Sequence, residues 1–260
     1  SGSLSFSGDT GDYISGGQSY AYSTPTDTLN VYGSVNDNNV EVSVAGADGA
    51  WWYLDLAAPS GQILAPGTYD NAARDPFQGP TQPGLSFYGD GRGCNTVTGS
   101  FTVQQAVFGP QGYVQELDAT FTQHCEGLTP ALYGEVHITN PPPPAQLSLG
   151  LNVATTGEAS SLDGNATISG TVSCNASVSV PVSGSVTEVV NKEIVRGNYS
   201  TSVACTPDAP APWSATSVPT GSVPFRQGEV EVQTHAQAVD PVYGNTVSAD
   251  QTTAVQLKHS

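Results

Sequence analysis

The chain has 260 residues, enough for two domains that each bury a core. Its 23 acidic and 6 basic residues give a net charge of −17, which argues against nucleic acid or an anionic membrane surface as partners, since both need clustered lysine and arginine. No run of about 18 apolar residues occurs, so no transmembrane segment is expected.

Three loops of the first half are candidate calcium sites. GDTGDY offers Asp9 and Asp12, VNDNNV offers Asp37, and GDGRGCN offers Asp90 and Asn95. Calcium takes about six to eight oxygen ligands from carboxylates, amides and backbone carbonyls. None of the loops has the regular Asp-x-Asp-x-Asp-Gly spacing, and Asn, Asp and Gly are equally typical of β-turns. Calcium is therefore a candidate cofactor, with ordinary turns as the alternative.

The segment AWWYLDLA predicts a strand with two different faces. Its apolar alternate residues are expected to pack inward: Trp52, Leu54 and Leu56. The residues between them would then face outward: Trp51, Tyr53 and Asp55. Such a face could stack on sugar rings and accept hydroxyl hydrogen bonds. It could equally contact another protein or pack under a loop.

The proline-rich and aromatic-rich segment 74–89 is expected to be a long ordered loop whose Phe77 extends the same surface. Residues 97–108 and 113–125 each alternate in polarity and predict two strands of a hairpin, joined by FGPQG. Val107 is expected on the apolar face of the first of these strands, and Glu116, Asp118 and His124 on the polar face of the second.

Four consecutive prolines, residues 141–144, predict a short polyproline II linker between a domain at 1–140 and a domain at 145–260. The first domain carries 14 acidic and 2 basic residues (−12), and the second carries 9 and 4 (−5). Alternating segments at 168–182, 198–205, 229–239 and 245–257 predict strands in the second domain. No segment has a helical period of useful length.

The four cysteines fall as two pairs, each 31 residues apart, on either side of the prolines: Cys94, Cys125, Cys174 and Cys205. Pairing of nearest neighbours, one disulfide in each half, is the most economical interpretation, and it implies an oxidising compartment. The chain has no methionine, which leads us to expect a mature or trimmed product. The expected fold is all-β, with two disulfide-containing, immunoglobulin-like β-sandwiches.

Most of residues 4–138 resemble a β module of secreted and surface proteins of bacteria, through the motifs GDYISGGQSY, WWYLDLAAP, GDGRGCN and QHCEG. The second half resembles immunoglobulin-like repeats of actinobacterial exported proteins, through SGTVSCNASVSV and GNYSTSVAC. These resemblances imply export and a β fold and supply no catalytic residues. They also imply a Cys94–Cys125 bridge, with Arg92 as a loop anchor for a nearby carboxylate such as Glu126.

The sequence thus favours a structural or adhesive protein without enzymatic activity that is secreted or held at the cell surface. One form of this hypothesis is a subunit of an extracellular fibre. Its expected partners are further copies, through strand addition or the aromatic surface. The first alternative is a carbohydrate-binding protein that uses Trp51 and Tyr53. The second is a hydrolase that uses Glu116 and Asp118 for acid/base chemistry, although no GxSxG, HExxH or P-loop motif is present.

Overall fold

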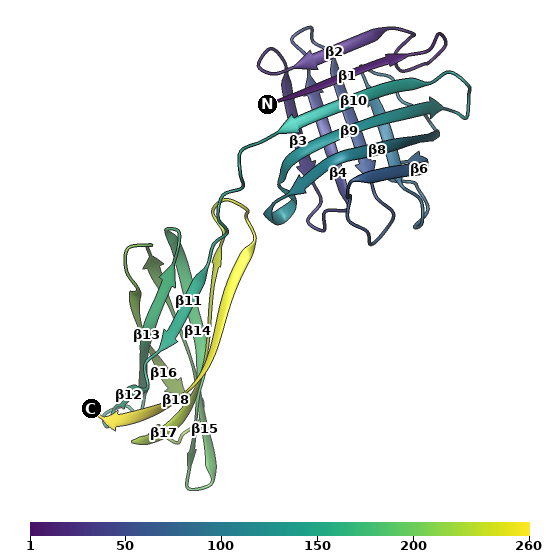
Figure 1. Cartoon of the computed structure of the whole chain (residues 1–260). Coiled ribbons are helices and arrows are strands. Elements are labelled where there is room, and N and C mark those ends of the chain that lie inside the picture. The colour runs from purple at the N-terminus through teal and green to yellow at the C-terminus, as the bar shows by residue number, and fades with distance from the viewer. The chain divides into compact units, whose positions relative to one another are not determined.

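The computed structural model describes residues 1–260 as two compact units, Ser1–Pro144 and Ala145–Ser260 (Figure 1). The all-β prediction is confirmed: the chain forms eighteen strands, one short 3-10 turn at Pro110–Gly112 and no α-helix. None of its helical structure is long and apolar enough to cross a membrane.

The first unit is one ten-stranded sheet. Its strands are β1 (Gly2–Gly8), β2 (Ser19–Ser23), β3 (Thr28–Gly33), β4 (Asn39–Ala45), β5 (Trp51–Ala57), β6 (Gly67–Arg74), β7 (Gly84–Gly89), β8 (Val97–Phe108), β9 (Val114–Cys125) and β10 (Leu132–Thr139). They are hydrogen-bonded in the order β2-β1-β10-β9-β8-β6-β7-β5-β4-β3. The β6–β7 step is parallel and only two residue pairs long, so the sheet turns there.

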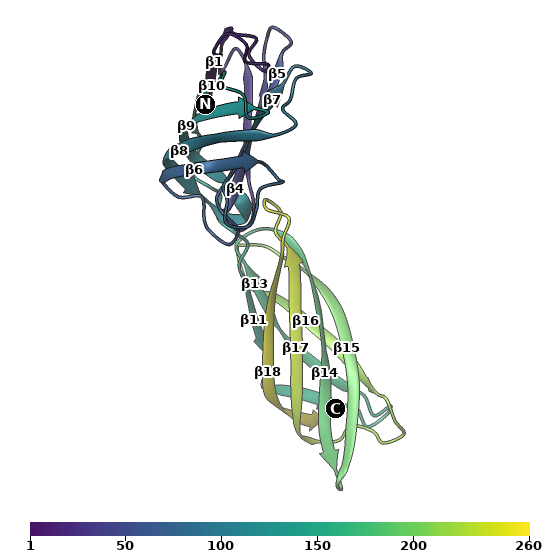
Figure 2. The ribbon, with the colours of Figure 1, turned by 90° about the vertical axis from the view of Figure 1, so that its right-hand side faces the viewer.

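The sheet folds over itself so that β1, β8, β9 and β10 run across β3 and β4 (Figures 1 and 2). The core of the unit fills the space between these two layers. Its largest side chains come from both layers: Trp52, Phe87 and Leu54 from one, and Leu4, Phe101 and Leu117 from the other. Each layer therefore has one apolar face and one outer face.

A buried amide joins the two layers. Gln123 of β9 accepts a hydrogen bond from the Phe87 backbone N–H at Oε1 (2.7 Å), and its Nε2 donates to the Phe87 carbonyl oxygen (2.8 Å). Phe87 lies beyond the last residue of β7 that pairs with β6, Leu85, so its backbone lacks a strand partner on that side. The Gln123 amide supplies both missing hydrogen bonds in the interior, where an unsatisfied group would be costly.

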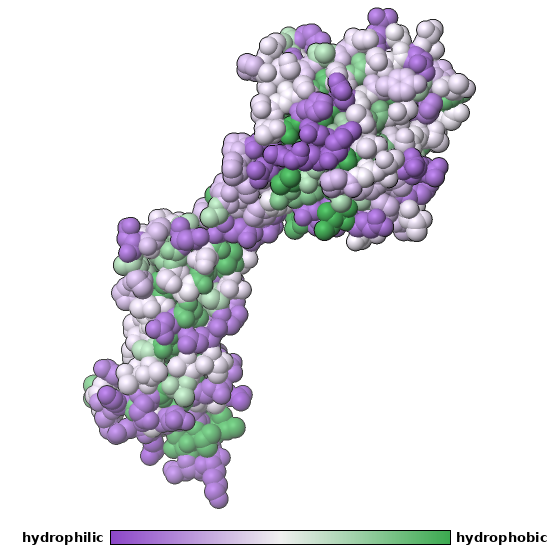
Figure 3. Space-filling model, viewed as in Figure 1, coloured by the Kyte–Doolittle hydropathy of each residue, from purple (hydrophilic) through white to green (hydrophobic).

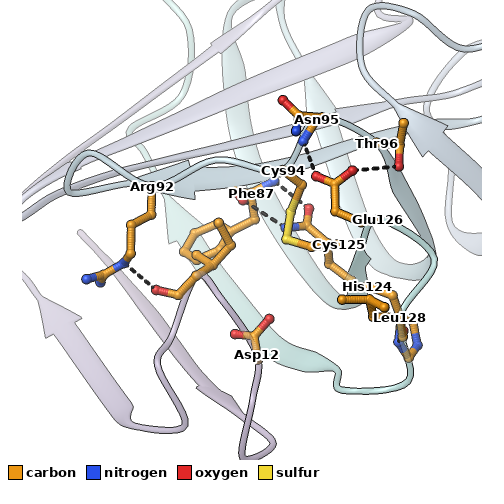
Figure 4. Close-up of a disulfide and its surroundings, with 12 residues drawn as sticks. Asp12, Phe87, Arg92, Cys94, Asn95, Thr96, His124, Cys125, Glu126 and Leu128 are labelled. Carbon is orange, nitrogen blue, oxygen red and sulfur yellow. Dashed lines mark hydrogen bonds between the residues drawn. A yellow bond between two sulfur atoms is a disulfide. The ribbon is translucent and has the colours of Figure 1, made fainter.

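The GDGRGCN segment forms a turn that delivers Cys94 to Cys125 beside this bridge (Figure 4). Glu126 accepts hydrogen bonds from the Asn95 backbone N–H and the Thr96 hydroxyl. The expected pairing of Arg92 with Glu126 is wrong. The Arg92 Nε donates instead to the Ile14 carbonyl oxygen (2.9 Å), and its guanidinium lies 5.6 Å from the Trp52 ring centroid.

The second unit contains β11 (Leu149–Val153), β12 (Thr156–Ala159), β13 (Ala166–Cys174), β14 (Val178–Val190), β15 (Glu193–Cys205), β16 (Ala211–Pro219), β17 (Gly228–Val239) and β18 (Thr246–His259). Their order is β11-β13-β12-β18-β17-β14-β15-β16, and a further β13–β16 pairing closes the sheet. The two sheets thus form barrel-like arrangements.

Two acidic side chains of the second unit are buried as backbone acceptors. The Asp240 carboxylate accepts from the N–H groups of Leu147 (2.6 Å), Val242 (2.8 Å) and Tyr243 (3.0 Å), which holds the start of the unit against the β17–β18 turn. The Leu147 bond is the main reason that the pKa of Asp240 is lowered. Glu188 accepts from the Arg226 N–H, while burial raises the pKa of Glu188.

The Cys174–Cys205 disulfide joins the ends of β13 and β15, so both disulfides follow the nearest-neighbour pairing expected from the sequence. Two other expectations are wrong. Residues 84–89 belong to the buried strand β7 rather than to a loop. Val107 is partly exposed because β-bulges in β8 shift its register against β9.

The Gln123 bridge predicts a large effect of Gln123→Leu on the first unit. The change leaves the Phe87 N–H and C=O groups buried without partners, which we expect to lower the free energy of unfolding by about 2–4 kcal/mol. Urea unfolding of the first unit measures this. Gln104→Leu, on the exposed side of β8, is the matched control with an expected change below about 0.5 kcal/mol. Equal effects of the two substitutions would contradict a stabilising role for the bridge.

Candidate ligand-binding site

The side chains of β5 alternate between a buried face and an outer face, as expected for a strand. Trp52, Leu54 and Leu56 are fully buried in the core. Trp51, with 43% of its surface exposed, and the half-buried Tyr53 and Asp55 lie on the opposite, outer face. The sequence-predicted contact residues of β5 therefore share one solvent-facing surface.

Neighbouring strands add side chains to this surface through their register. Tyr88 of β7 lies opposite Tyr53, and Glu41 of β4 lies opposite Asp55. The Tyr53 and Tyr88 rings are stacked with centroids 5.5 Å apart, and Trp51 meets Tyr53 edge to face at 5.9 Å. Three aromatic rings thus follow one another along the outer face of β5 and β7.

The segment after β6 covers the same face at its other end. A side chain at Gly84 would collide with Asp75 Oδ1 and Gln78 Nε2, so Gly84 allows these two groups to approach the sheet closely. Gln78 Nε2 donates to Asp75 Oδ1 (2.9 Å). The Arg74 guanidinium lies 5.1 Å from the ring centroid of Phe77, of which 73% is exposed.

We call this surface the aromatic–acidic patch. It consists of Glu41, Trp51, Tyr53, Asp55, Arg74, Asp75, Phe77, Gln78 and Tyr88. The structure places Trp51, Tyr53 and Asp55 on the outer face of β5, and Phe77 against Arg74 just after β6.

Burial and, to a smaller extent, neighbouring negative charge raise pKa values in the patch. Desolvation, with smaller contributions from the charges of Asp75 and Glu41, raises the pKa of Asp55 to about 7. Desolvation and the neighbouring Asp55 and Glu41 also raise the pKa of Tyr88. Near neutral pH the Asp55 carboxyl group therefore exchanges between a form that donates a hydrogen bond and a form that only accepts.

The candidate calcium residues are separated among three loops. Asp9 accepts a hydrogen bond from the Ala131 N–H (3.0 Å). The buried Asp12 accepts from both the N–H and the hydroxyl of Ser15, at 2.8 and 2.6 Å, so it stabilises its own turn. These carboxylates already have protein donors.

The other three calcium candidates also occupy turns. Asp37 and Asp90 have positive φ angles of 56° and 51°, the left-handed conformation common in tight turns. The Asn95 carbonyl oxygen accepts from Arg74 Nη1 (2.9 Å). No group of three or more His, Cys, Asp or Glu side chains is arranged to hold a metal ion.

The carboxylates considered for acid/base chemistry lie on the outer face of β9. Asp118 Oδ1 is 2.9 Å from His137 Nδ1, an interaction with the neighbouring strand β10. Glu116 accepts a hydrogen bond from Gln105 of β8. His124 points outward and its Nδ1 is 3.0 Å from the Leu128 carbonyl oxygen. Each of the three side chains thus has a different local partner.

Sequence reasoning missed five residues of the patch: Glu41, Arg74, Asp75, Gln78 and Tyr88. Alternation in NNVEVSVA places Glu41 opposite the valines, so its outward direction was available from the sequence. Its position beside Asp55 was not, because that depends on the β4–β5 register. The sequence did not reveal the position of Tyr88, because residues 84–89 lack the alternation of a half-buried strand. Every residue of β7 except Tyr88 is buried, so both faces of the strand are apolar or small.

No protein-family model matches the chain, and no curated protein sequence matches it significantly.

The raised pKa of Asp55 predicts a pH-dependent effect of Asp55→Asn. Between about pH 4 and 7 the folded chain retains a proton that the unfolded chain has lost, so the stability of the first unit falls as pH rises through this window. Asp55→Asn removes the buried charge. We expect it to stabilise the unit by about 1 kcal/mol at pH ~8, a value discounted for solvent screening, with the gain shrinking towards pH ~4.

Thermal unfolding followed by circular dichroism across this pH range measures the effect. Asp70→Asn, an exposed position of β6, removes the same charge and serves as the control. A gain that is the same at both ends of the pH range would contradict the assignment.

Proposed function

We propose that this chain is a secreted or cell-surface adhesive protein without enzymatic activity, which binds carbohydrate through the aromatic–acidic patch. The observation that carries the proposal is the row of Trp51, Tyr53 and Tyr88 rings on the outer face of one layer. Phe77, of which 73% is exposed, lies against Arg74 of the same patch.

Carbohydrate fits this surface because a sugar ring has both an apolar face and a rim of hydroxyl groups. Aromatic side chains offer apolar faces at a fixed spacing along the strand. Asp55 and Asp75 lie beside them and can form hydrogen bonds with hydroxyl groups. The buried faces of β5 and β7 hold the rings in place, so little conformational entropy is lost on binding.

The disulfides and the composition of the chain, rather than the candidate site, support a location outside the cell. The only four cysteines form two disulfides, a modification that persists in oxidising compartments. The net charge of −17 and the resemblance to exported bacterial modules agree with this location.

We also propose that the units are β-sandwiches linked by the proline run, the second of them immunoglobulin-like. In the second unit, the β11-β13-β16 pairings and the β18-β17-β14-β15 pairings are consistent with two facing layers. Trp213 of β16 stacks on Tyr199 of β15 in the core, at a centroid distance of 6.1 Å. In the first unit, the crossing of the two layers supports the same description.

Trp51→Ala tests the carbohydrate proposal. We expect the loss of the exposed ring to weaken glycan binding at least about tenfold, because each stacking ring contributes roughly 1–2 kcal/mol, while the stability of the unit changes little. A glycan array first selects the ligand, and calorimetry then compares the variants. Tyr133→Ala is the matched control, since Tyr133 is similarly exposed on β10 of the other layer. Undiminished binding by Trp51→Ala would reject the patch as the binding surface.

Self-association is a second candidate function, favoured by a gap in the sheet of the second unit. β14 and β17 pair only over Val182–Thr187 and Glu231–Ala236. Residues 178–181 of β14 and 237–239 of β17 therefore do not pair with each other. A hollow of about 420 Å³ lies there, with an entirely uncharged lining: Val178, Ser179, Pro181, Gln237, Ala238, Val239 and Thr246. Two free strand edges would accept an extended segment of a second copy.

Val239→Lys tests this second candidate, because a charge in the gap should prevent an apolar strand from entering. Electron microscopy and light scattering of the unmodified chain are expected to show oligomers or fibres, and the variant should remain monomeric. Val189→Lys is the control. Val189 pairs with Ile194 at the exposed tip of the β14–β15 hairpin, where Figure 3 shows a hydrophobic area near the lower end of the unit. A monomeric unmodified chain at high concentration would reject self-association.

A further inference from the structure

The aromatic–acidic patch has an excess of negative charge, with three carboxyl groups and one basic residue. Three carboxyl groups, those of Glu41, Asp55 and Asp75, interact electrostatically across it. The first unit has only two basic residues, and Arg92 is engaged with Ile14 and Trp52. Arg74 is the only basic residue in the patch, and its Nη1 donates a hydrogen bond to the Asn95 carbonyl oxygen. None of the three carboxylates forms an ion pair in the structure.

The patch also has more hydrogen-bond acceptors than donors. The amide oxygen Oε1 of Gln78 is buried and accepts no hydrogen bond, although the Nε2 of the same amide donates to Asp75.

The aromatic rings also favour a cation. The face of an aromatic ring is negative and attracts ammonium groups, and rings combined with carboxylates form the cages that recognise them. Tyr88 interacts electrostatically with Asp55 and Glu41, and the rings of Tyr53 and Trp51 continue the row from Tyr88. The rings and the carboxyl groups therefore favour the same kind of ligand, a cation.

We propose that the patch binds the protonated primary amine of an amino sugar, as in a glycan whose amino groups are free rather than acetylated. This inference rests on the proposed carbohydrate function and names its ligand class. The sugar ring stacks on Trp51 and Tyr53, and the ammonium group lies between Asp55 and Asp75. Sugars with carboxylate or sulfate groups are disfavoured because the patch and the first unit as a whole are negative.

Binding is then coupled to the protonation of Asp55. The titratable groups that face it are Glu41 on β4, Tyr88 on β7 and Asp75 after β6, and the nearest cation is Arg74. An ammonium ion favours the ionised form of Asp55, so binding near neutral pH releases a proton.

The experiment compares two oligosaccharides of equal length, one of glucosamine and one of N-acetylglucosamine, by calorimetry with the whole chain. We expect at least about tenfold tighter binding of the glucosamine oligomer at pH ~7 and a decrease of this preference with added salt. Asp55→Asn and Asp75→Asn should each remove the preference while the fold, followed by circular dichroism, is retained. Asp70→Asn, outside the patch, should keep it.

The outcomes separate the two levels of the proposal. Equal affinity for both oligosaccharides, lost in Trp51→Ala, would overturn the amine inference and leave the carbohydrate function standing. Binding of neither oligosaccharide nor any array glycan would overturn both. Tight binding of oligolysine without binding of the glucosamine oligomer would also overturn the inference, since the ammonium ligand would then be a peptide.

Discussion

The two hydrogen bonds between the Gln123 side chain and the Phe87 backbone are the constraint on which the first unit depends. The sheet changes direction between β6 and β7 after only two residue pairs, which leaves the backbone of β7 open in the core. Only a side chain that both donates and accepts, at the spacing of a peptide group, can replace the missing strand. The Cys94–Cys125 disulfide lies next to this bridge and closes the same corner, with Gln123 Nε2 3.5 Å from Cys94 Sγ.

This corner is also what positions the candidate site. Once β7 is held against β9 through Phe87, the next residue, Tyr88, must face the opposite side of the layer. There it stacks on Tyr53, and the chain that enters β7 carries Asp75 and Gln78 over Gly84. The core and the patch are thus the two faces of the same strands, so the packing of Trp52 and Phe87 gives the outer rings their rigidity.

The carboxyl groups of the chain fall into two kinds, those with backbone hydrogen-bond donors and those without. Buried carboxylates with backbone donors stabilise loops, as Asp12 does in the first unit and Asp240 in the second. The Asp55 carboxyl group has no such donor, and its pKa is raised rather than lowered. A group kept in an unfavourable environment without a structural partner is typical of a binding surface. The proposed ammonium ligand would offset the cost that the fold leaves uncompensated.

The sequence by itself determined the strand class of both halves, the disulfide pairing and the outward direction of Trp51, Tyr53 and Asp55. Each of these follows from alternation or from cysteine spacing, which are properties of a single strand or of chain order. Only the tertiary structure decided that Glu41, Asp75 and Tyr88 join them, that Arg92 contacts Ile14 and that Val107 turns outward. The physical reason is that strand register, β-bulges and the corner between layers depend on contacts between distant residues. No local pattern along the chain records those contacts.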